Sequence, residues 1–226
     1  MLLALAERLD ARRDELRAAN ARDLDASRAA GLPSAKLRRL ELTTAGLDQM
    51  IAGLRQVAGL TDPVGQITKD YHVESGLHVQ RVRIPIGVIA MIYEARPNVT
   101  IDAFALCFKA GNACLLKGGR EAAHSNAALA EEVRTVLRAH NLPAGAIAAL
   151  TATSRDDIRA LLELDQYIDL VIPRGGAELI RFVHEHSRIP TIQHFQGVCH
   201  IFVDESAKLD AALEICTTTK TSAPAT

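Results

Sequence analysis

Hydrophobic residues recur every three or four positions in the N-terminal part of the chain, and this spacing predicts amphipathic helices. The first such segment carries a stripe of leucines among charged residues: Leu2, Leu5, Leu9 and Leu16. Gly31-Leu32-Pro33-Ser34 then breaks the pattern. Thr43-Thr44 is suited to cap a second helix, whose stripe consists of Leu47, Met50, Ile51, Leu54 and Val57. Each stripe is expected to pack on a core.

Hydrophobic and polar residues alternate between Ile67 and Ile84, which is the pattern of strands with two different faces. Glu74-Ser75-Gly76 divides this stretch in two. We therefore predict a β-hairpin over residues 66–85, with one polar face that carries basic residues. Two strands alone are only marginally stable in water, so the apolar face of the hairpin is expected to be covered.

Beyond the hairpin, short apolar runs alternate with segments of helical periodicity. The runs are Ile86–Ile92, Ala113–Leu116, Ala146–Leu150, Tyr167–Ile172 and Val198–Val203. Helices are expected at Val99–Ala110, from Asn126 to near His140, at Ser154–Leu164, after Arg174-Gly175-Gly176, and at Ala207–Thr219. Buried parallel strands are short continuous apolar runs, and parallel neighbours need a crossover of about a dozen residues. The predicted fold class is α/β: a doubly wound, mostly parallel sheet of the Rossmann type with a protruding β-hairpin.

The composition is that of a globular protein with one substantial core, since 48% of the 226 residues are hydrophobic and 23% are charged. The formal net charge of -1 gives no basic surface for nucleic acid, so no nucleic-acid partner is expected. No apolar run approaches the ~20 residues of a membrane span, and the N-terminus acquires charges too early for a signal peptide. These features predict a cytoplasmic protein with no membrane partner.

The cysteines of the chain are scattered and form no C-x-x-C pair, so neither a zinc site nor a disulfide framework is expected. They are Cys107, Cys114, Cys199 and Cys216. Each lies among apolar residues, where cysteine packs as a small hydrophobic side chain. We expect no metal site.

Two glycine pairs occupy equivalent places in the predicted sheet. Lys117-Gly118-Gly119 follows the second apolar run, Arg174-Gly175-Gly176 follows the fourth, and a helix follows each. Backbone N–H groups at such a corner can face an anion at the helix N-terminus. Neither the G-x-G-x-x-G nor the phosphate-loop fingerprint is present, so each pair alone is also consistent with a tight turn. Two corners on one edge of a sheet favour a dinucleotide site.

Four long segments, in the same order, carry a resemblance to a known family: IPIGVIAMIYEARPNVTIDA, AGNACLLKGGREAAHSN, IDLVIPRGGAELI and GVCHIFVD. They resemble the gamma-glutamyl phosphate reductases (glutamate-5-semialdehyde dehydrogenases), a branch of the aldehyde dehydrogenase superfamily that serves proline synthesis. The resemblance covers nearly the whole chain and begins weakly in the first helix. It implies an aldehyde-dehydrogenase-like fold.

The resemblance also implies roles for single residues. Asn98, which the sequence alone would place as a helix N-cap, would donate its amide to the oxyanion formed during acyl transfer. Lys117 would contact the adenosine ribose of a nicotinamide cofactor. Relatives often carry a glutamate three residues later, where this chain has Arg120, and a guanidinium suits a 2′-phosphate. NADP(H) is therefore favoured over NAD(H). The predicted cofactor-binding residues are Lys117, Gly118, Gly119, Arg120, Arg174, Gly175 and Gly176.

The implied domain organisation has one interrupted domain. Residues 1–65 and 86–226 would form the NADP-binding domain, and residues 66–85 would be the hairpin through which a homo-oligomer assembles. A hairpin folded onto its own domain is the alternative. Glu94 and Arg96 either recognise the amino acid end of a substrate or pair with each other.

The implied reaction is the reduction of gamma-glutamyl phosphate by NADPH to glutamate 5-semialdehyde and phosphate, through a cysteine thioester. Aldehyde-oxidising relatives carry a glutamate base in the segment matching His194-Phe195-Gln196-Gly197, which has no carboxylate here. Loss of that base suits an acyl group that exchanges with phosphate instead of being hydrolysed.

None of the cysteines matches the family's nucleophile, which follows a segment similar to residues 220–226. We therefore expect the nucleophile and the catalytic domain to lie after residue 226, and the 226-residue chain alone to lack reductase activity. One alternative is a non-catalytic, truncated homologue that binds NADP(H) or pairs through its hairpin. Another is a thioester-forming relative with a different acyl substrate, although the EARPN and IPRGG segments favour the glutamyl phosphate branch.

Overall fold

The structure is a computed structural model that describes residues 1–150, 154–193 and 200–221. The chain forms two compact units, Met1–Gln193 and His194–Thr226, and each is described by itself.

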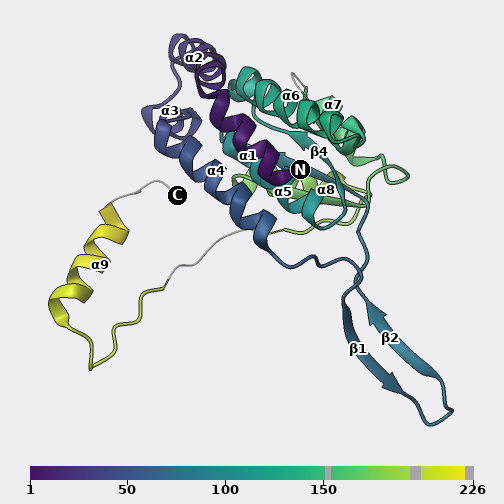
Figure 1. The fold of residues 1–226 in the computed structure, drawn as a ribbon. Coiled ribbons are helices and arrows are strands. Elements are labelled where there is room, and N and C mark those ends of the chain that lie inside the picture. Colours follow the sequence, from purple (N-terminus) through teal and green to yellow (C-terminus); the bar gives the residue numbers. More distant parts are fainter. Residues whose placement is uncertain (151–153, 194–199, 222–226) are drawn as a thin grey trace. The chain divides into compact units, whose positions relative to one another are not determined.

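The first unit contains both helices and strands, many of which are labelled in Figure 1. Its α-helices are α1 (Leu2–Ala11), α2 (Arg13–Ala29), α3 (Ser34–Leu40), α4 (Thr44–Gly59), α5 (Asn98–Lys109), α6 (Ala123–Ala139), α7 (Arg155–Leu162) and α8 (Ala177–His186). Its strands are β1 (Ile67–His72), β2 (His78–Val82), β3 (Val88–Tyr93), β4 (Ala113–Lys117), β5 (Ile147–Leu150) and β6 (Leu170–Arg174). Two short 3₁₀ helices are η1 (Arg120–Ala122) and η2 (Ala144–Ala146).

A four-stranded parallel sheet with the order β5-β4-β3-β6 forms the centre of this unit. Successive side chains of β3 point to opposite faces of the sheet. Ile89 and Tyr93 therefore pack in one core, whereas Ala90 and Ile92 pack in another. Four of the five predicted runs became the strands β3 to β6, and helices cover both faces of their sheet.

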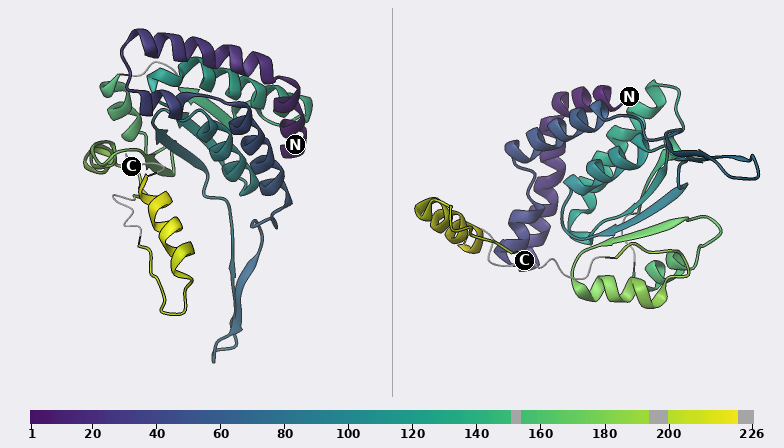
Figure 2. Two further views of the ribbon diagram at one scale, coloured as in Figure 1. Left: turned by 90° about the vertical axis from the view of Figure 1, so that its left-hand side faces the viewer. Right: turned by 90° about the horizontal axis from the view of Figure 1, so that it is seen from below.

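Helices lie on both faces of the sheet (Figure 2). On one face, α5 and α6 pack on the strands, and α1 and α4 pack on these helices in turn. On the other face, α7 and α8 supply Ile158, Leu162 and Val183 to the second core. The predicted doubly wound α/β fold is confirmed.

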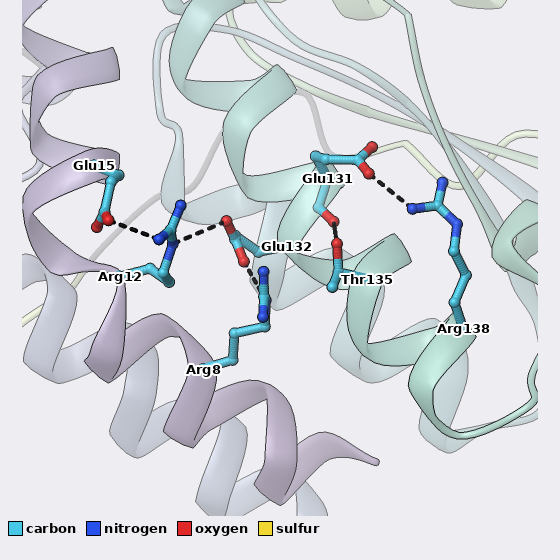
Figure 3. A network of polar contacts seen from close by, with 7 residues as sticks. All are labelled: Arg8, Arg12, Glu15, Glu131, Glu132, Thr135 and Arg138. Carbon is cyan, nitrogen blue, oxygen red and sulfur yellow. Dashed lines mark hydrogen bonds and ion pairs between the residues drawn. The ribbon is translucent and has the colours of Figure 1, made fainter.

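The N-terminal region differs in detail from the expected single helix. The backbone of Arg12 departs from helical geometry at φ −113° and ψ 23°, which separates α1 from α2. The break allows Arg8 of α1 and Arg12 at the junction to approach the same carboxylate, Glu132 of α6 (Figure 3). Arg12 Nη1 also lies 2.7 Å from Glu15 Oε1. These ion pairs fasten the N-terminal helices to α6.

The second predicted helix is confirmed as α4, and its predicted cap forms. The Thr43 side chain accepts a hydrogen bond of 3.0 Å from Gly46 N. Helix α3, by contrast, is an element that the hydrophobic pattern did not predict. It buries one residue, Leu40, so it has too short an apolar stripe to detect.

The hairpin is confirmed, with β1 antiparallel to β2. Tyr71 pairs with Val79 and His72 pairs with His78. The hairpin extends away from the sheet and its helices, and every residue of β1 is exposed (Figure 1). The alternative of a hairpin folded onto its own domain is therefore wrong for this structure.

In the second unit, the structure describes one helix, α9 (Leu209–Thr221). The sequence predicted a strand over Val198–Val203, whose first two residues lie outside the described part. Residues 200–203 are not in a strand, and Phe202 is 87% exposed. A strand needs a hydrogen-bonded neighbour, and these four residues have none among the described ranges, so that prediction is wrong for them.

Candidate functional site

Three strands end side by side at the carboxyl edge of the sheet. Lys117, the last residue of β4, lies in register with Ile92 of β3. Arg174, the last residue of β6, lies in register with Tyr93. The sequence-predicted corners that contain Gly118 and Gly175 therefore flank the end of β3. In doubly wound sheets, ligands bind at this edge, in the crevice where the strand order reverses, and here it reverses between β3 and β6.

At the first corner, Lys117 is half-buried and Gly118 is buried. Burial lowers the pKa of the Lys117 ammonium, while Glu121 opposes this shift and Arg120 adds to it. A Cβ atom on Gly118 would lie 2.1 Å from Asn126 Nδ2 and 3.1 Å from Tyr93 Cε2. Any other residue here would force the Asn126 side chain of α6 to shift.

The helix after this corner already has an anion at its N-terminus. Asp23 of α2 accepts hydrogen bonds from His124 N (3.0 Å), Ser125 N (2.7 Å) and Ser125 Oγ (2.6 Å). His124 Nδ1 lies 2.7 Å from the same carboxylate. The chain therefore supplies its own anion at the N-terminus of α6. The roles of Gly118 and Gly119 themselves stay predictions.

At the second corner, Gly176 is the N-cap residue of α8, and its N–H donates to Glu94 Oε1 over 3.1 Å. A Cβ atom on Gly175 would lie 2.9 Å from Glu94 Cδ. No ion pair joins the Glu94 and Arg96 side chains within the described ranges. The Glu94 carboxylate therefore lies at the N-terminus of α8, beside the point where the strand order reverses. A phosphate group would suit the same position.

Asn98 is the first residue of α5, and Pro97 holds the N-cap position without a side-chain cap. The N-cap role considered for Asn98 is therefore wrong. Its Nδ2 donates to Asp102 Oδ2 over 3.1 Å, one helical turn later. Partial burial raises the pKa of Asp102, and the hydrogen bond from Asn98 opposes that rise. The oxyanion role of Asn98 stays a prediction.

Two pockets lie beside the segment that joins β3 to α5. The larger, of about 290 Å³, contains Asn98 and is lined by Arg39, Glu41, Leu42, Gly46, Gln49, Met50, Pro97, Asn98 and Asp102. The smaller, of about 190 Å³, is lined by Lys36, Arg39, Glu94, Ala95, Arg96 and Glu121. Arg39 contributes to both, so the two pockets are neighbours. Lys117 and Gly175 line neither pocket, but Glu94 and Glu121 of the smaller pocket lie against the Gly175 and Gly119 backbones.

Buried hydrogen bonds connect the elements behind this edge. The Thr100 hydroxyl donates to Asn126 Oδ1 over 3.0 Å, and Tyr93 OH lies 2.7 Å from Thr100 Oγ1. Because Thr100 has one hydroxyl hydrogen, Tyr93 donates to Thr100. Burial raises the pKa of Tyr93 to about 12. The chain of bonds joins the end of β3, the first turn of α5 and α6, so it fixes Asn98 and Gly118 relative to each other.

Sequence reasoning missed several of these residues. Asp102 had a usable signal, because it stands four positions after Asn98 on a predicted helix. Asp23 had none, because it acts on residues about a hundred positions later. Arg39 and Glu41 belong to the region around α3, which the hydrophobic pattern did not resolve, whereas Gln49 lies on the predicted helix α4.

Cys107 and Cys114, the described cysteines of the first unit, line neither pocket. Cys107 and Cys114 are buried, and Cys216 is half-buried in α9. The hydrogen bond that Cys114 donates to Cys107, together with burial, raises the pKa of the Cys114 thiol. Cys199 and the segment His194–Gly197 lie outside the described residues. Over the described ranges, no three His, Cys, Asp or Glu side chains come together to hold a metal ion, and no helix is long and apolar enough to cross a bilayer.

A parallel, doubly wound sheet whose polar corners meet at the reversal of strand order is the architecture of nucleotide-binding α/β proteins. Comparison with known proteins narrows this class. The profile described as the aldehyde dehydrogenase family matches residues 1–223, and the chain belongs to that family.

Three known proteins illustrate the likeness. A gamma-glutamyl phosphate reductase from Xanthomonas campestris pv. campestris is 51% identical over 224 residues, which are 99% of this chain and 54% of that protein. The crystal structure of a gamma-glutamyl phosphate reductase from Thermotoga maritima superposes with a TM-score of 0.89 at 40% identity, over 100% of this chain and 54% of that one. PnpE in complex with nicotinamide adenine dinucleotide shares the fold alone, with a TM-score of 0.70 at 22% identity over 94% of this chain and 41% of that one.

The chain spans about half the length of the curated relatives it matches. The part of the chain that aligns with these relatives includes the sheet, its carboxyl edge and the hairpin.

Proposed function

We propose that this chain is the NADP(H)-binding part of a gamma-glutamyl phosphate reductase, which works in the cytoplasm in proline synthesis. The observation that carries the proposal is the carboxyl edge of the sheet, where Lys117 and Arg174 flank the end of β3 in a chain 51% identical to proteins of that name. In this proposal, residues 1–65 and 86–226 form the cofactor domain.

The residues of the edge fit a dinucleotide with one rearrangement. Lys117 and the neighbouring Arg120 provide positive charge at the end of β4, where an adenosine ribose and its 2′-phosphate would lie. The N-terminus of α8 suits the pyrophosphate. Glu94 now bonds to Gly176 N there, so a bound phosphate would displace its carboxylate. When bound, the reduced nicotinamide supplies the hydride.

In the proposed reaction, a cysteine thiolate attacks the acyl carbon of gamma-glutamyl phosphate and phosphate leaves with the electron pair of the broken C–O bond. Hydride transfer to the resulting thioester then releases the aldehyde and regenerates the thiolate. Asn98 would hold the acyl oxygen as it gains negative charge, a contribution of about 3 kcal/mol to lowering the barrier. Cys107 and Cys114 are buried, and none of the chain's cysteines matches the family's nucleophile, so the thiolate would come from another part of the protein.

Cofactor binding to the purified 226-residue chain tests the proposal. NADPH should bind at least ten-fold more tightly than NADH, measured by titration calorimetry, because Arg120 favours the 2′-phosphate. Arg120→Glu should remove or reverse this preference. Arg17→Glu makes the same change of charge at an exposed position on α2. It is the matched control and should leave the preference for NADPH unchanged.

Equal affinities for NADPH and NADH would contradict the proposed preference for NADP(H). If neither cofactor bound, the proposal that this chain is a cofactor-binding domain would be wrong. The same preparation should show no turnover of gamma-glutamyl phosphate with NADPH. Robust turnover would mean that the nucleophile lies within the chain.

The proposal includes a homo-oligomer that assembles through the hairpin. Its support is the exposure of the β1–β2 hairpin, whose apolar residues Ile67, Tyr71 and Val82 are about half exposed. Two isolated strands gain stability only when other surface covers them.

A further inference from the structure

The pocket that contains Asn98 carries charges of both signs. Arg39 of α3 supplies a guanidinium, and Glu41 and Asp102 supply carboxylates. Gln49 of α4 adds an amide to the same lining. We propose that this pocket holds the α-carboxylate and α-ammonium groups of the glutamyl substrate, with the γ-acyl group at Asn98. The inference rests on the proposed function and names the residues that would make the enzyme specific for an α-amino acid.

The size of the pocket suits a metabolite of this kind. Its volume is about 290 Å³, just below the roughly 300–1,000 Å³ that ligand pockets span. A dinucleotide needs a longer crevice, and the glycine corners for which a cofactor is proposed do not line this pocket. One small zwitterion beside Asn98 is the occupant that fits both observations.

The chemistry of the lining matches the two α-groups separately. A guanidinium binds a carboxylate through two parallel hydrogen bonds, which a point charge does not reproduce. An ammonium has three N–H donors and no acceptor, so it suits the carboxylates of Glu41 and Asp102. With one positive and two negative side chains, the pocket disfavours a ligand that carries carboxylates but no amine.

Asn98 gives the ligand a direction. Its Nδ2 has two hydrogens, and one of them is donated to Asp102 Oδ2. That bond sets the side-chain amide at the α5 end of the pocket, while Arg39 enters from α3. The acyl end of the substrate would therefore point to α5 and the α-carboxylate to α3.

Binding of three neutral-amide analogues to the 226-residue chain tests the inference. L-glutamine carries both α-groups and an uncharged γ-carbonyl, glutaramate lacks the α-amino group, and 4-aminobutanamide lacks the α-carboxylate. L-glutamine should bind with a Kd on the order of 1 mM, detected by NMR shifts of the Asn98 and Asp102 amides. Each truncated analogue should bind at least ten-fold more weakly. No shifts, or equal affinity for the three, would overturn the inference.

Two substitutions separate the α-groups. Arg39→Gln should weaken L-glutamine binding at least ten-fold, whereas Arg38→Gln, on the same helix but outside the pocket lining, should not change it. Glu41→Gln should weaken the binding of L-glutamine but not that of glutaramate. The ratio of the two dissociation constants should therefore move toward one, even if the variant is less stable. Circular dichroism of each variant shows whether it is folded. If Glu41→Gln leaves the ratio of the two dissociation constants unchanged, Glu41 does not bind the α-ammonium group.

NADPH titration of the same preparation separates this inference from the proposed function. A chain that binds NADPH but not L-glutamine would refute the amino acid pocket and leave the reductase assignment standing. A chain that binds L-glutamine through Arg39 but neither nicotinamide cofactor would support the pocket and refute the reductase assignment.

Discussion

Gly118 belongs both to the candidate cofactor corner and to the buried hydrogen bonds behind it. Its backbone is close enough to Asn126 that a side chain has no space, since a Cβ atom would lie 2.1 Å from Nδ2. Asn126 cannot simply rotate away, because its Oδ1 accepts the Thr100 hydroxyl in a buried site. The sequence showed a glycine at a strand end but could not show which neighbour requires it.

Gly118→Ala should lower the free energy of unfolding by about 1–3 kcal/mol, through overpacking and the broken Thr100–Asn126 bond. Gly145→Ala is the matched control, because nothing lies within 4 Å of its would-be Cβ. Urea unfolding of both variants measures the difference. If the two variants had equal urea midpoints, the Asn126 side chain would be able to move without loss of stability. The fixed geometry assigned to this corner would then be wrong.

Asp102 gives a prediction about pH. Its folded-state pKa is raised above the ordinary 3.8 by partial burial, so the ionised carboxylate is less favourable in the folded chain than in the unfolded one. The stability that the protonated form contributes is present below pH 3.8 and is lost as pH rises through the folded-state pKa. Ionised Asp102 therefore opposes folding at neutral pH.

Asp102→Asn should leave the chain as stable as before at pH 7 or stabilise it by less than about 1 kcal/mol, since the carboxylate is partly solvated. The gain should disappear below pH 3.8. Thermal unfolding at pH 7, 5 and 3.5 measures it. A clear loss of stability at pH 7 would mean that the Asn98 bond outweighs the burial of the charge.

At the scale of elements, the connection between α2 and α6 depends on Asp23. This carboxylate is buried and accepts from the backbone of His124 and Ser125, at the start of α6, and from the Ser125 hydroxyl. Asn20, one turn earlier, donates to Leu40 O and Ser125 Oγ, and accepts from Leu42 N. Helix α2 therefore fixes both the start of α6 and the strand-like segment after α3.

Asp23→Ala should destabilise the chain by about 3 kcal/mol, because it removes a helix cap and leaves a buried hydroxyl without its acceptor. Asp25→Ala removes an exposed pair with Arg28 on the same helix and should change stability by less than about 0.5 kcal/mol. Chemical denaturation compares the two. A similar small effect of both would show that water replaces the lost cap.

The elements that the sequence predicted are those whose signals are local. The apolar runs, the Thr43 cap and the glycine turn of the hairpin each depend on a few adjacent residues, so periodicity and turn chemistry were sufficient. The contacts that shape the site are not local. Glu94 reaches Gly176 across 82 positions and Asp23 reaches Ser125 across 102. They depend on the strand order, which the apolar runs alone do not specify.

The same reason explains the errors. The break at Arg12 accompanies a contact with Glu132, 120 positions later on α6, and a strand at residues 200–203 would require a partner strand that the pattern does not name. The expected anion at the start of α6 was a correct reading of helix-terminus chemistry. The anion that the structure shows there is Asp23, a carboxylate of the chain itself.

At the scale of the whole molecule, the hairpin is a separable module. Its two ends meet at backbone hydrogen bonds, from Gly65 N to Arg83 O and from Arg83 N to Gln66 O, each 2.9 Å. The strands pair with each other and with no other strand in the described structure. Its removal should not disturb the sheet.

Replacing residues 67–82 by a short glycine-rich turn should leave the unfolding temperature of the sheet unchanged, because β1 has no buried residue. If the hairpin mediates assembly, the deletion should convert an oligomer to a monomer in analytical ultracentrifugation. An oligomer that survives the deletion would place the interface elsewhere. A large drop in unfolding temperature would mean that the hairpin supports the core.

The order β5-β4-β3-β6 also has a consequence for the growing polypeptide. β3 can pair with β4 soon after both strands are synthesised. The other edge of β3 stays unpaired until β6 (Leu170–Arg174) has left the ribosome. During that interval, Val88–Tyr93 offers an open, hydrophobic edge of the kind that joins strands from other molecules. Nascent chains paused before residue 170 should therefore associate with chaperones more than chains that have passed residue 174.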